Sequence, residues 1–297
     1  FVLSGTSGWR LPGPKIVDGG GVVQPESVDR AKGNAALHRL VRAASGIVAP
    51  SRRAATAIGS LVGGQAVSVI APAPLPASFA VVDEGESRRR LAEDLRELFT
   101  GGAVTKLHRH FCDFPFERVE YLVAAPSRGA TPILPAYAAV MRRHRRNLKL
   151  VVDGRLPSGR GHVADIHAMG LTFDVAEAAG LPEDARARLL RHARAVVVPD
   201  LDGPCLPPVF AEAVAAGTPV VLGRSPAVHE VMPDTELSSP ECFDVGSGAE
   251  ESLVRAILHV LEHREEVLAR QRGLLARLAS RTWQDVAQDY LRLVDSR

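Results

Sequence analysis

The sequence predicts an α/β protein whose larger, C-terminal part is a doubly wound parallel sheet. Two observations lead to this expectation. Several short segments after Pro115 are apolar at almost every position, as in strands that are buried on both faces. Each of them alternates with an amphipathic, helical stretch along the chain. A parallel sheet covered by helices on both faces accounts for both observations.

The first 115 residues contain fewer regular units than the rest of the chain. Residues 1–35 are rich in Gly and Pro without sustained periodicity. We interpret Gly19–Gly21 as a turn, because the run lacks the Lys and Ser/Thr of a phosphate-binding loop. The elements predicted here are a helix over 34–44, a buried strand within 45–51 with Ser51 capping the next helix, a strand within 66–76, and an exposed helix plus connector over 83–110.

Regular alternation begins after Pro115. Strands are predicted over 119–127, 148–154, 194–200 and 218–223. Helices are predicted over 132–146, 182–193, 209–217, 249–279 and 282–294. Each strand–helix–strand unit is expected to be right-handed, which brings the carboxyl ends of the strands to one edge of the sheet.

Composition excludes several classes of protein. The formal net charge of +2 over 297 residues is too small for the positive field of a nucleic-acid binder. The three cysteines, Cys112, Cys205 and Cys242, are odd in number and far apart, which argues against a disulfide framework. With no signal peptide and no apolar run long enough to span a membrane, a cytoplasmic location is expected.

Ligands of open parallel sheets bind outside the carboxyl ends of the strands. The loops to inspect are therefore 125–132, 152–161 and 199–208. The last of these leads into an alanine-rich helix that carries one carboxylate, Glu212, and stops at Gly217 and Pro219 before a buried strand.

Four stretches in this order carry a family resemblance. They are "YLVAAPSRGATPILPAYAAVMRRH", "LPEDARARLLRHARAVVVPD", "EAVAAGTPVVLGRSPAVHEVMPD" and "TWQDVAQDYLRLV". Together they resemble the nucleotide-sugar-dependent glycosyltransferases of the GT-B fold, in the large retaining group (glycosyl transferases group 1, family 4-like) that contains many mannosyltransferases. The likeness covers roughly residues 116–297.

The resemblance implies a domain organisation. Residues 116–280 would form a Rossmann-like domain that binds the nucleotide sugar, and 281–297 a helix that returns to the first domain. Residues 1–115 would form a partial or reduced acceptor-side domain with its linker, because such a domain needs about 150 residues. The chain begins with Phe1 rather than Met, so a fragment or a processed protein is expected. In a truncated first domain, Trp283, Tyr290 and Leu291 would leave an apolar patch.

The resemblance also implies site residues. Sugar transfer from a nucleoside diphosphate builds negative charge on the leaving phosphate, which cationic side chains and helix N-termini stabilise. Arg128 would face the diphosphate, and Glu212 would accept hydrogen bonds from the ribose diol. The candidate donor-binding residues are Arg128, Thr131, Gly180, Asp202, Gly203 and Glu212. No metal or cofactor is expected, and the sequence does not identify the catalytic residues.

The sequence departs from the family in the donor loop. Thr131 lies where the family has a lysine, and Pro204 occupies the position of an earlier family glutamate, with Asp202 two residues away. Pro204, Pro207 and Pro208 also lack backbone N–H groups. A catalytically degenerate nucleotide-binding or assembly module, or a nucleotide-sugar epimerase, therefore remains open beside the hexosyltransferase interpretation.

Three local alternatives also remain open. Glu212 could be a first-turn acid that only stabilises its helix. The run "RRHRRNLK" (142–149) is a solvated helix end or a peripheral contact with an acidic membrane. The run "HRHFC" (108–112) offers metal ligands, but no second cluster completes a site. The acceptor, whether a glycan, a lipid or a small molecule, is not indicated.

Overall fold

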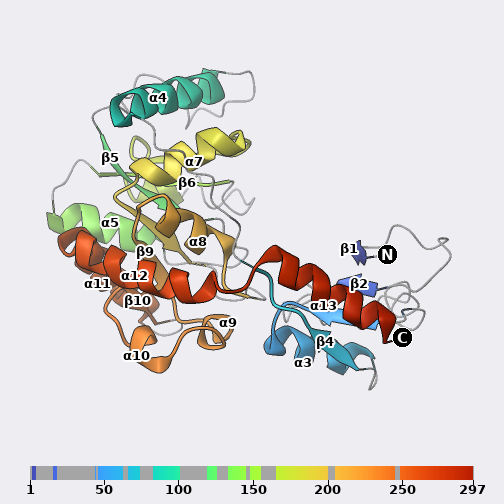
Figure 1. Ribbon diagram of the computed structural model, residues 1–297. Helices are drawn as coiled ribbons and strands as arrows, with labels where there is room; N and C mark the ends of the chain where they lie inside the picture. The colour runs from blue at the N-terminus through green and yellow to red at the C-terminus, as the bar shows by residue number, and fades with distance from the viewer. Residues whose placement is uncertain are drawn as a thin grey trace.

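The computed structural model contains two parallel sheets side by side (Figure 1). The C-terminal helix extends from the larger sheet's domain to the smaller sheet. The structure describes residues 2–4, 16–18, 44, 46–62, 66–73, 83–100, 119–125, 133–144, 148–154, 165–199, 205–244 and 248–296. The predicted helix over 34–44 lies outside these residues except for Ala44.

The N-terminal sheet has four parallel strands in the order β1-β2-β3-β4. The strands are β1 (Val2–Ser4), β2 (Ile16–Asp18), β3 (Gly46–Ala49) and β4 (Val67–Val69). Helix α3 (Arg52–Val62) connects β3 to β4, and its Ala54 and Ile58 pack against Ile47. Ser51 accepts a hydrogen bond from the Ala54 N–H at 3.1 Å, so the predicted cap is confirmed. The sequence analysis missed β1 and β2, because three-residue strands among Gly and Pro leave no periodic pattern.

The C-terminal sheet has six parallel strands in the order β10-β9-β8-β5-β6-β7. The strands are β5 (Glu120–Ala124), β6 (Leu148–Val152), β7 (Val175–Glu177), β8 (Ala195–Val198), β9 (Val220–Gly223) and β10 (Cys242–Phe243). Counted along the chain, this is the order 3-2-1-4-5-6 of a Rossmann sheet. The predicted doubly wound sheet is confirmed, although the short edge strands β7 and β10 were not predicted.

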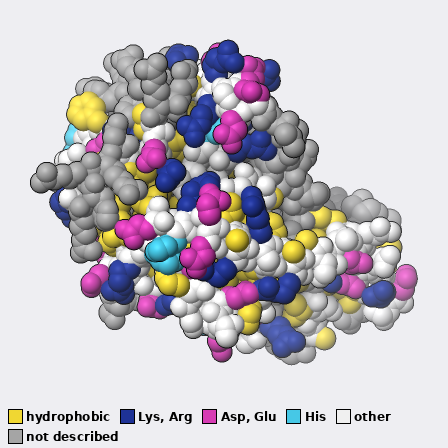
Figure 2. All heavy atoms as spheres, turned by 60° about the vertical axis from the view of Figure 1, so that its left-hand side comes forward, with side chains coloured by type: hydrophobic (Ala, Val, Ile, Leu, Met, Phe, Trp, Pro, Cys, Tyr) yellow, Lys and Arg dark blue, Asp and Glu magenta, His cyan; other side chains and the backbone are white. Residues whose placement is uncertain are grey.

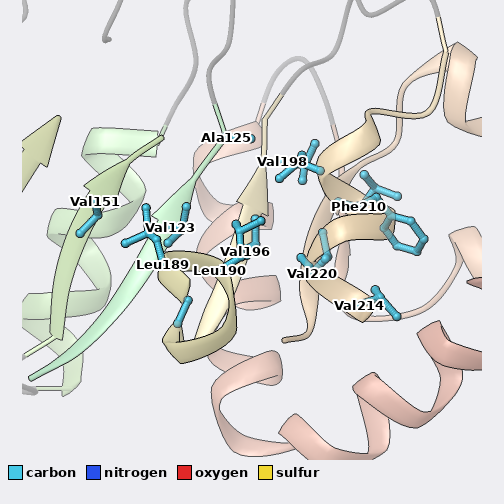
Figure 3. Packing of buried hydrophobic residues seen from close by; sticks show 14 of the residues in the cluster. Val123, Ala125, Val151, Leu189, Leu190, Val196, Val198, Phe210, Val214 and Val220 are labelled. Atoms are coloured by element: carbon cyan, nitrogen blue, oxygen red, sulfur yellow. The ribbon is translucent and has the colours of Figure 1, made fainter. Parts of the chain in front are cut away.

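Helices cover both faces of this sheet because alternate residues of each strand point to opposite sides. On β5, Leu122 and Ala124 pack toward α5 (Ile133–His144) and α11 (Ala249–Glu262). The alternate residue Val123 belongs to the cluster on the other face, with side chains from α7, α8 and the central strands (Figure 3). The helices of that face are α4 (Glu84–Thr100), α7 (Glu183–His192), α8 (Pro208–Ala215) and α12 (Arg264–Leu278).

Helix α4 differs from its prediction. The segment forms the expected helix, but Leu91 and Leu95 on its inner face are fully buried, and Arg188 on α7 pairs with Asp94 at 2.8 Å. The expectation of an exposed helix is therefore wrong for this face. Although α4 precedes residue 115, where the domain boundary is predicted, it packs on the C-terminal sheet.

Between β9 and β10 lie two short helices, α9 (Pro226–His229) and α10 (Asp234–Leu237). The last helix, α13 (Trp283–Asp295), begins with a capping box formed by Thr282 and Asp285.

The C-terminal helix extends from the C-terminal domain over the N-terminal sheet (Figure 1). Val286 of α13 packs with Val48 and Ile70, and Tyr290 is partly buried against the same cluster. Trp283 is 45% exposed and Leu291 is 61% exposed.

On the face shown in Figure 2, acidic and basic side chains are interspersed rather than gathered by sign. No helix among the described residues is both long enough and apolar enough to cross a membrane.

Candidate functional site

The crevice expected to bind ligand lies where the strand order of the C-terminal sheet reverses. Strand β5 pairs with both β6 and β8. After β5 the chain continues to α5 on one face, and after β8 it continues to α8 on the other, so the two outgoing loops part at the carboxyl edge. Four candidate residues of these loops lie outside the described residues: Arg128, Thr131, Asp202 and Gly203.

Glu212 lies at this edge, on α8, and is held by an arginine of α7. Nη1 of Arg186 contacts Oε2 of Glu212 at 2.5 Å. Nε of the same arginine donates to Oδ2 of Asp153, the residue after β6, at 2.7 Å. Asp153 is itself fixed next to the end of β5, because its N–H donates to the carbonyl of Ala124 at 2.9 Å. One arginine thus joins a carboxylate that directly follows β6 to a carboxylate on α8.

These three side chains are shielded from water to different degrees. The exposed fraction is 9% for the Asp153 side chain, 17% for Glu212 and 30% for Arg186. Burial lowers the pKa of Arg186, but the carboxylates of Asp153 and Glu212 outweigh it, and the pKa is raised overall. The guanidinium of Arg186 therefore stays charged between its two carboxylate partners.

The alternative interpretation of Glu212 as a first-turn acid is wrong. The first turn of α8 contains no acidic residue, and the N-cap, Pro207, makes no side-chain capping bond. Glu212 is the fifth residue of the helix and directs its carboxylate to α7. Its place is therefore decided by a tertiary ion pair rather than by the helix terminus.

Gly180 lies in the turn between β7 and α7, at the same edge of the sheet. Its φ of +87° is in the left-handed region, and no atom lies within 4 Å of the position that a Cβ would take. The turn itself therefore accounts for a glycine here. Contact with a donor at Gly180 remains a prediction.

A cavity of about 670 Å³ opens between the two sheets and reaches the start of α8. From the N-terminal side it is lined by Arg52 and Val69, and from the C-terminal side by Leu206, Pro207 and Val231, among others. Trp283 at the start of α13 also lines it. Glu212 is not among the described residues that line this cavity, so the carboxylate lies beside the cleft rather than within it.

Glu230, in the "HEV" element of the sequence, connects the two sides of the cleft. Its carboxylate accepts hydrogen bonds from the N–H groups of Arg52 at 2.8 Å and Arg53 at 2.7 Å. These are orphan donors at the N-terminus of α3, where a negative charge is favourable. The C-terminal domain thus caps a helix of the N-terminal domain.

Sequence reasoning missed Asp153, Arg186 and the role of Glu230. Arg186 lies 33 residues from Asp153 and 26 from Glu212, and Arg52 lies 178 residues from Glu230. A weak signal existed for Asp153, since it directly follows an apolar strand. In the part of the chain that the structure describes, no group of three or more His, Cys, Asp or Glu side chains is placed to hold a metal ion. The "HRHFC" run lies outside it.

Comparison with solved structures shows the same fold over almost the whole chain. The crystal structure of Anabaena Alr3699/HepE in complex with UDP matches with a TM-score of 0.60 and 17% identity, over 96% of this chain and 72% of that one. WaaG, described as a glycosyltransferase involved in lipopolysaccharide biosynthesis, matches with a TM-score of 0.63 and 12% identity, over 96% and 76%. Sucrose-phosphate synthase from Thermosynechococcus elongatus matches with a TM-score of 0.59 and 14% identity, over 97% of this chain and 69% of that one.

Comparison at the level of sequence places the family in the C-terminal domain. Residues 122–263 match the family described as "Glycosyl transferases group 1". No curated protein matches the chain. The matched segment runs from β5 to the end of α11 and contains Asp153, Arg186 and Glu212. Residues 122–263 are therefore similar to the group 1 glycosyltransferases, within a chain that has the GT-B fold.

Proposed function

We propose that this protein is a glycosyltransferase that transfers a hexosyl group, with mannosyl as one candidate, from a nucleoside-diphosphate sugar with retention of configuration. The observation that carries the proposal is Glu212, held beside the switch point of a Rossmann sheet by Arg186. Only Oε2 of Glu212 is engaged with a described residue. A carboxylate has about four acceptor positions, so it retains capacity for a ribose diol.

The neighbours support a nucleotide sugar as the donor. Structures of Anabaena Alr3699/HepE are described in complex with UDP and with UDP-glucose. In this chain the start of α8 faces the cleft without a side-chain cap. A helix N-terminus in that position favours the diphosphate. Arg128 is proposed as its forked cationic partner, with Thr131, Gly180, Asp202 and Gly203 as further donor contacts.

The cleft is proposed to hold the acceptor. Three of the exposed large apolar side chains, Val69, Val231 and Trp283, line the cavity of about 670 Å³. Their chemistry fits an acceptor with an apolar surface, such as the face of a sugar ring or a lipid portion. The basic residues that precede β6 are proposed as a peripheral membrane contact. Lys149 is excluded from this contact, because it is buried in β6 and pairs with Asp174, so the expectation of a solvated run is wrong at that residue.

Calorimetric titration with UDP and GDP tests the donor site. We expect saturable binding of at least one of them, and no binding at millimolar concentration of either would contradict the proposal. A transfer assay with nucleotide sugars and a panel of acceptors then tests activity.

A catalytically degenerate, nucleotide-binding module is the second candidate. One observation favours it: Pro207 is the N-cap of α8 and Pro208 its first residue, so the helix start offers fewer N–H donors to a phosphate. Binding of a nucleoside diphosphate without transfer to any acceptor would support this candidate, and a transfer product would exclude it.

A further inference from the structure

Arg186 is placed to control the carboxylate of Glu212, and nothing in the family resemblance assigns it a role. It lies in α7, near the N-terminus of the helix, and reaches both Asp153 after β6 and Glu212 in α8. We name these three residues the acid–arginine clamp. Its members come from three elements that meet at the carboxyl edge of the sheet.

The clamp uses only part of the hydrogen-bonding capacity of Glu212. Nη1 of Arg186 occupies one acceptor position, on Oε2. A carboxylate can accept about four hydrogen bonds. With respect to the described residues, Oε1 and the rest of Oε2 therefore keep capacity for two hydroxyl groups. The clamp is therefore compatible with simultaneous binding of a diol.

The clamp also removes the freedom of a long side chain before any ligand arrives. Fixing a glutamate in one rotamer is entropically unfavourable, and this cost falls on binding when the side chain is mobile in the free protein. Arg186 fixes Glu212, and Asp153 in turn fixes Arg186 at 2.7 Å. Asp153 is only 9% exposed and its N–H is bonded to the Ala124 carbonyl, so the far end of the clamp is anchored to the sheet.

We propose that Arg186 is a positioning residue that presents the Glu212 carboxylate to the 2′- and 3′-hydroxyls of a ribonucleoside diphosphate. The clamp thereby sets the preference for ribose over a sugar without these hydroxyls. This inference rests on the proposed function, since it requires that Glu212 contacts the ribose. The base and the diphosphate are bound by other groups, so their contribution to affinity does not depend on Arg186.

The test compares UDP or GDP, whichever binds, with the corresponding 2′,3′-dideoxynucleoside diphosphate by calorimetry. The variants are Arg186→Met, which keeps length and helix propensity but removes every donor, and Arg186→Lys. Arg188→Met is the matched control, because Arg188 lies on the same helix and pairs with Asp94 and Asp184 instead of Glu212. A purely structural role for the arginines of α7 would affect stability in both Met variants without changing the ribose preference.

The parent protein is expected to prefer the ribonucleotide by about tenfold or more, the usual effect of losing hydrogen bonds to a charged group. Arg186→Met should lose most of this preference through weaker ribonucleotide binding, with dideoxy binding unchanged, and Arg188→Met should keep it. Lysine keeps the positive charge but lacks the rigid planar fork that directs Nε to Asp153 and Nη1 to Glu212, so Arg186→Lys should give an intermediate preference.

The possible failures are distinguishable. A parent protein that binds no nucleoside diphosphate contradicts the proposed function and with it the clamp. A parent that binds the ribonucleotide and the dideoxynucleotide equally leaves nucleotide binding standing but overturns the clamp, because Glu212 then contributes no contact with the ribose hydroxyls. A parent with a clear ribose preference that Arg186→Met retains leaves the proposed function standing and overturns the clamp. If Arg186→Met does not fold, Arg186→Lys decides: an undiminished preference would overturn the inference.

Discussion

Single residues at the carboxyl edge of the six-stranded sheet are held by partners that are distant in the sequence. Glu212 is fixed by Arg186, and Arg186 by Asp153. A few residues later Gly217 ends α8 with a φ of +88°, which turns the chain into β9. The ion pair of Glu212 with Arg186 is a tertiary contact, whereas the turn at Gly217 is a local feature of the backbone. Each of them leads to a separate prediction.

Glu212→Gln should weaken binding of a nucleoside diphosphate by about 1–3 kcal/mol, because a charge-assisted acceptor becomes a neutral amide. Calorimetry measures the affinity. The free energy of unfolding should also fall, by about 1 kcal/mol, because Arg186 loses its ion pair with Glu212 while its ion pair with Asp153 is kept. The control is Glu251→Gln, an exposed carboxylate on α11 that pairs with Arg255. Equal nucleotide affinity in Glu212→Gln and the parent would remove Glu212 from the donor site.

Gly217→Ala should lower the free energy of unfolding by about 1 kcal/mol, because the left-handed conformation strains any residue with a Cβ. Crowding adds little, since the nearest atom to the new Cβ, Nη2 of Arg272, lies at an ordinary 3.7 Å. The paired control is Gly59→Ala in α3, where no atom lies within 4 Å and φ is not positive. That change should stabilise by up to about 1 kcal/mol. Chemical denaturation measures both, and effects of the same sign would contradict the argument.

At the scale of elements, α4 is attached to the C-terminal domain through α7. Leu91 and Leu95 supply the apolar contact, and the guanidinium of Arg188 bonds Asp94. Nε2 of His192, at the end of α7, lies 2.8 Å from the hydroxyl of Ser87. Burial lowers the pKa of His192 to about 4, with Arg88 and Arg191 acting in the same direction and Glu84 opposing them. The packing of α4 on α7 therefore depends on an uncharged histidine.

The free energy of unfolding should fall as pH is lowered from 7 to 5, in part because of His192. Its pKa in the unfolded chain is near 6.5, so in this range the unfolded state takes up a proton that the folded state does not. Each pKa unit corresponds to about 1.4 kcal/mol, which gives a loss of about 2 kcal/mol at pH 5. Urea denaturation at several pH values measures it.

The histidine contribution is isolated with a variant that cannot titrate. His192→Gln should lower stability at pH 7 but reduce the loss between pH 7 and pH 5. His229→Gln, an exposed histidine of α9, serves as the control and should follow the parent. An identical pH dependence in His192→Gln and the parent would show that His192 does not link pH to stability.

At the scale of the whole molecule, two parallel sheets lie on either side of a cleft, and side chains of the described residues connect them. Nε of Arg281, just before α13, donates to the carbonyl of Ala71 at 2.9 Å. On the other side of the cleft, Glu230 caps α3 through the N–H groups of Arg52 and Arg53. The packing of α13 on Val48 and Ile70 adds an apolar connection. In the part of the chain that the structure describes, these side chains hold the two domains together.

Glu230→Ala should release the N-terminus of α3 from the C-terminal domain at a cost of about 1 kcal/mol, the usual effect of losing a helix cap. Amide hydrogen exchange followed by NMR should show faster exchange at Arg52 and Arg53. The amide of Ala54 is an internal control, because it is bonded to the Ser51 side chain of the same domain. Unchanged exchange at Arg52 and Arg53 would mean that the contact does not persist in solution.

Most elements of the C-terminal domain could be predicted because their signals are local. The strand 148–152 is buried at every position, and the helix 249–262 has a clear apolar face. The short strands β7 and β10 could not be found, since two or three residues hold no period. The buried face of α4 was not predicted, because its apolar residues lie within a strongly charged segment. These residues are buried by packing against α7, which is distant in the sequence.

The sequence by itself determined the alternation of strands and helices after residue 116, the place of Glu212 in a helix after a buried strand, and the likeness to group 1 glycosyltransferases. These follow from neighbours along the chain, whose periodicity and turn chemistry act locally. Only the tertiary structure decided the strand order, the pairing of Glu212 with Arg186, and the contact of Glu230 with α3. Such pairings join residues 26 to 178 positions apart. They depend on which surfaces the folded sheets bring together, and no local pattern encodes that choice.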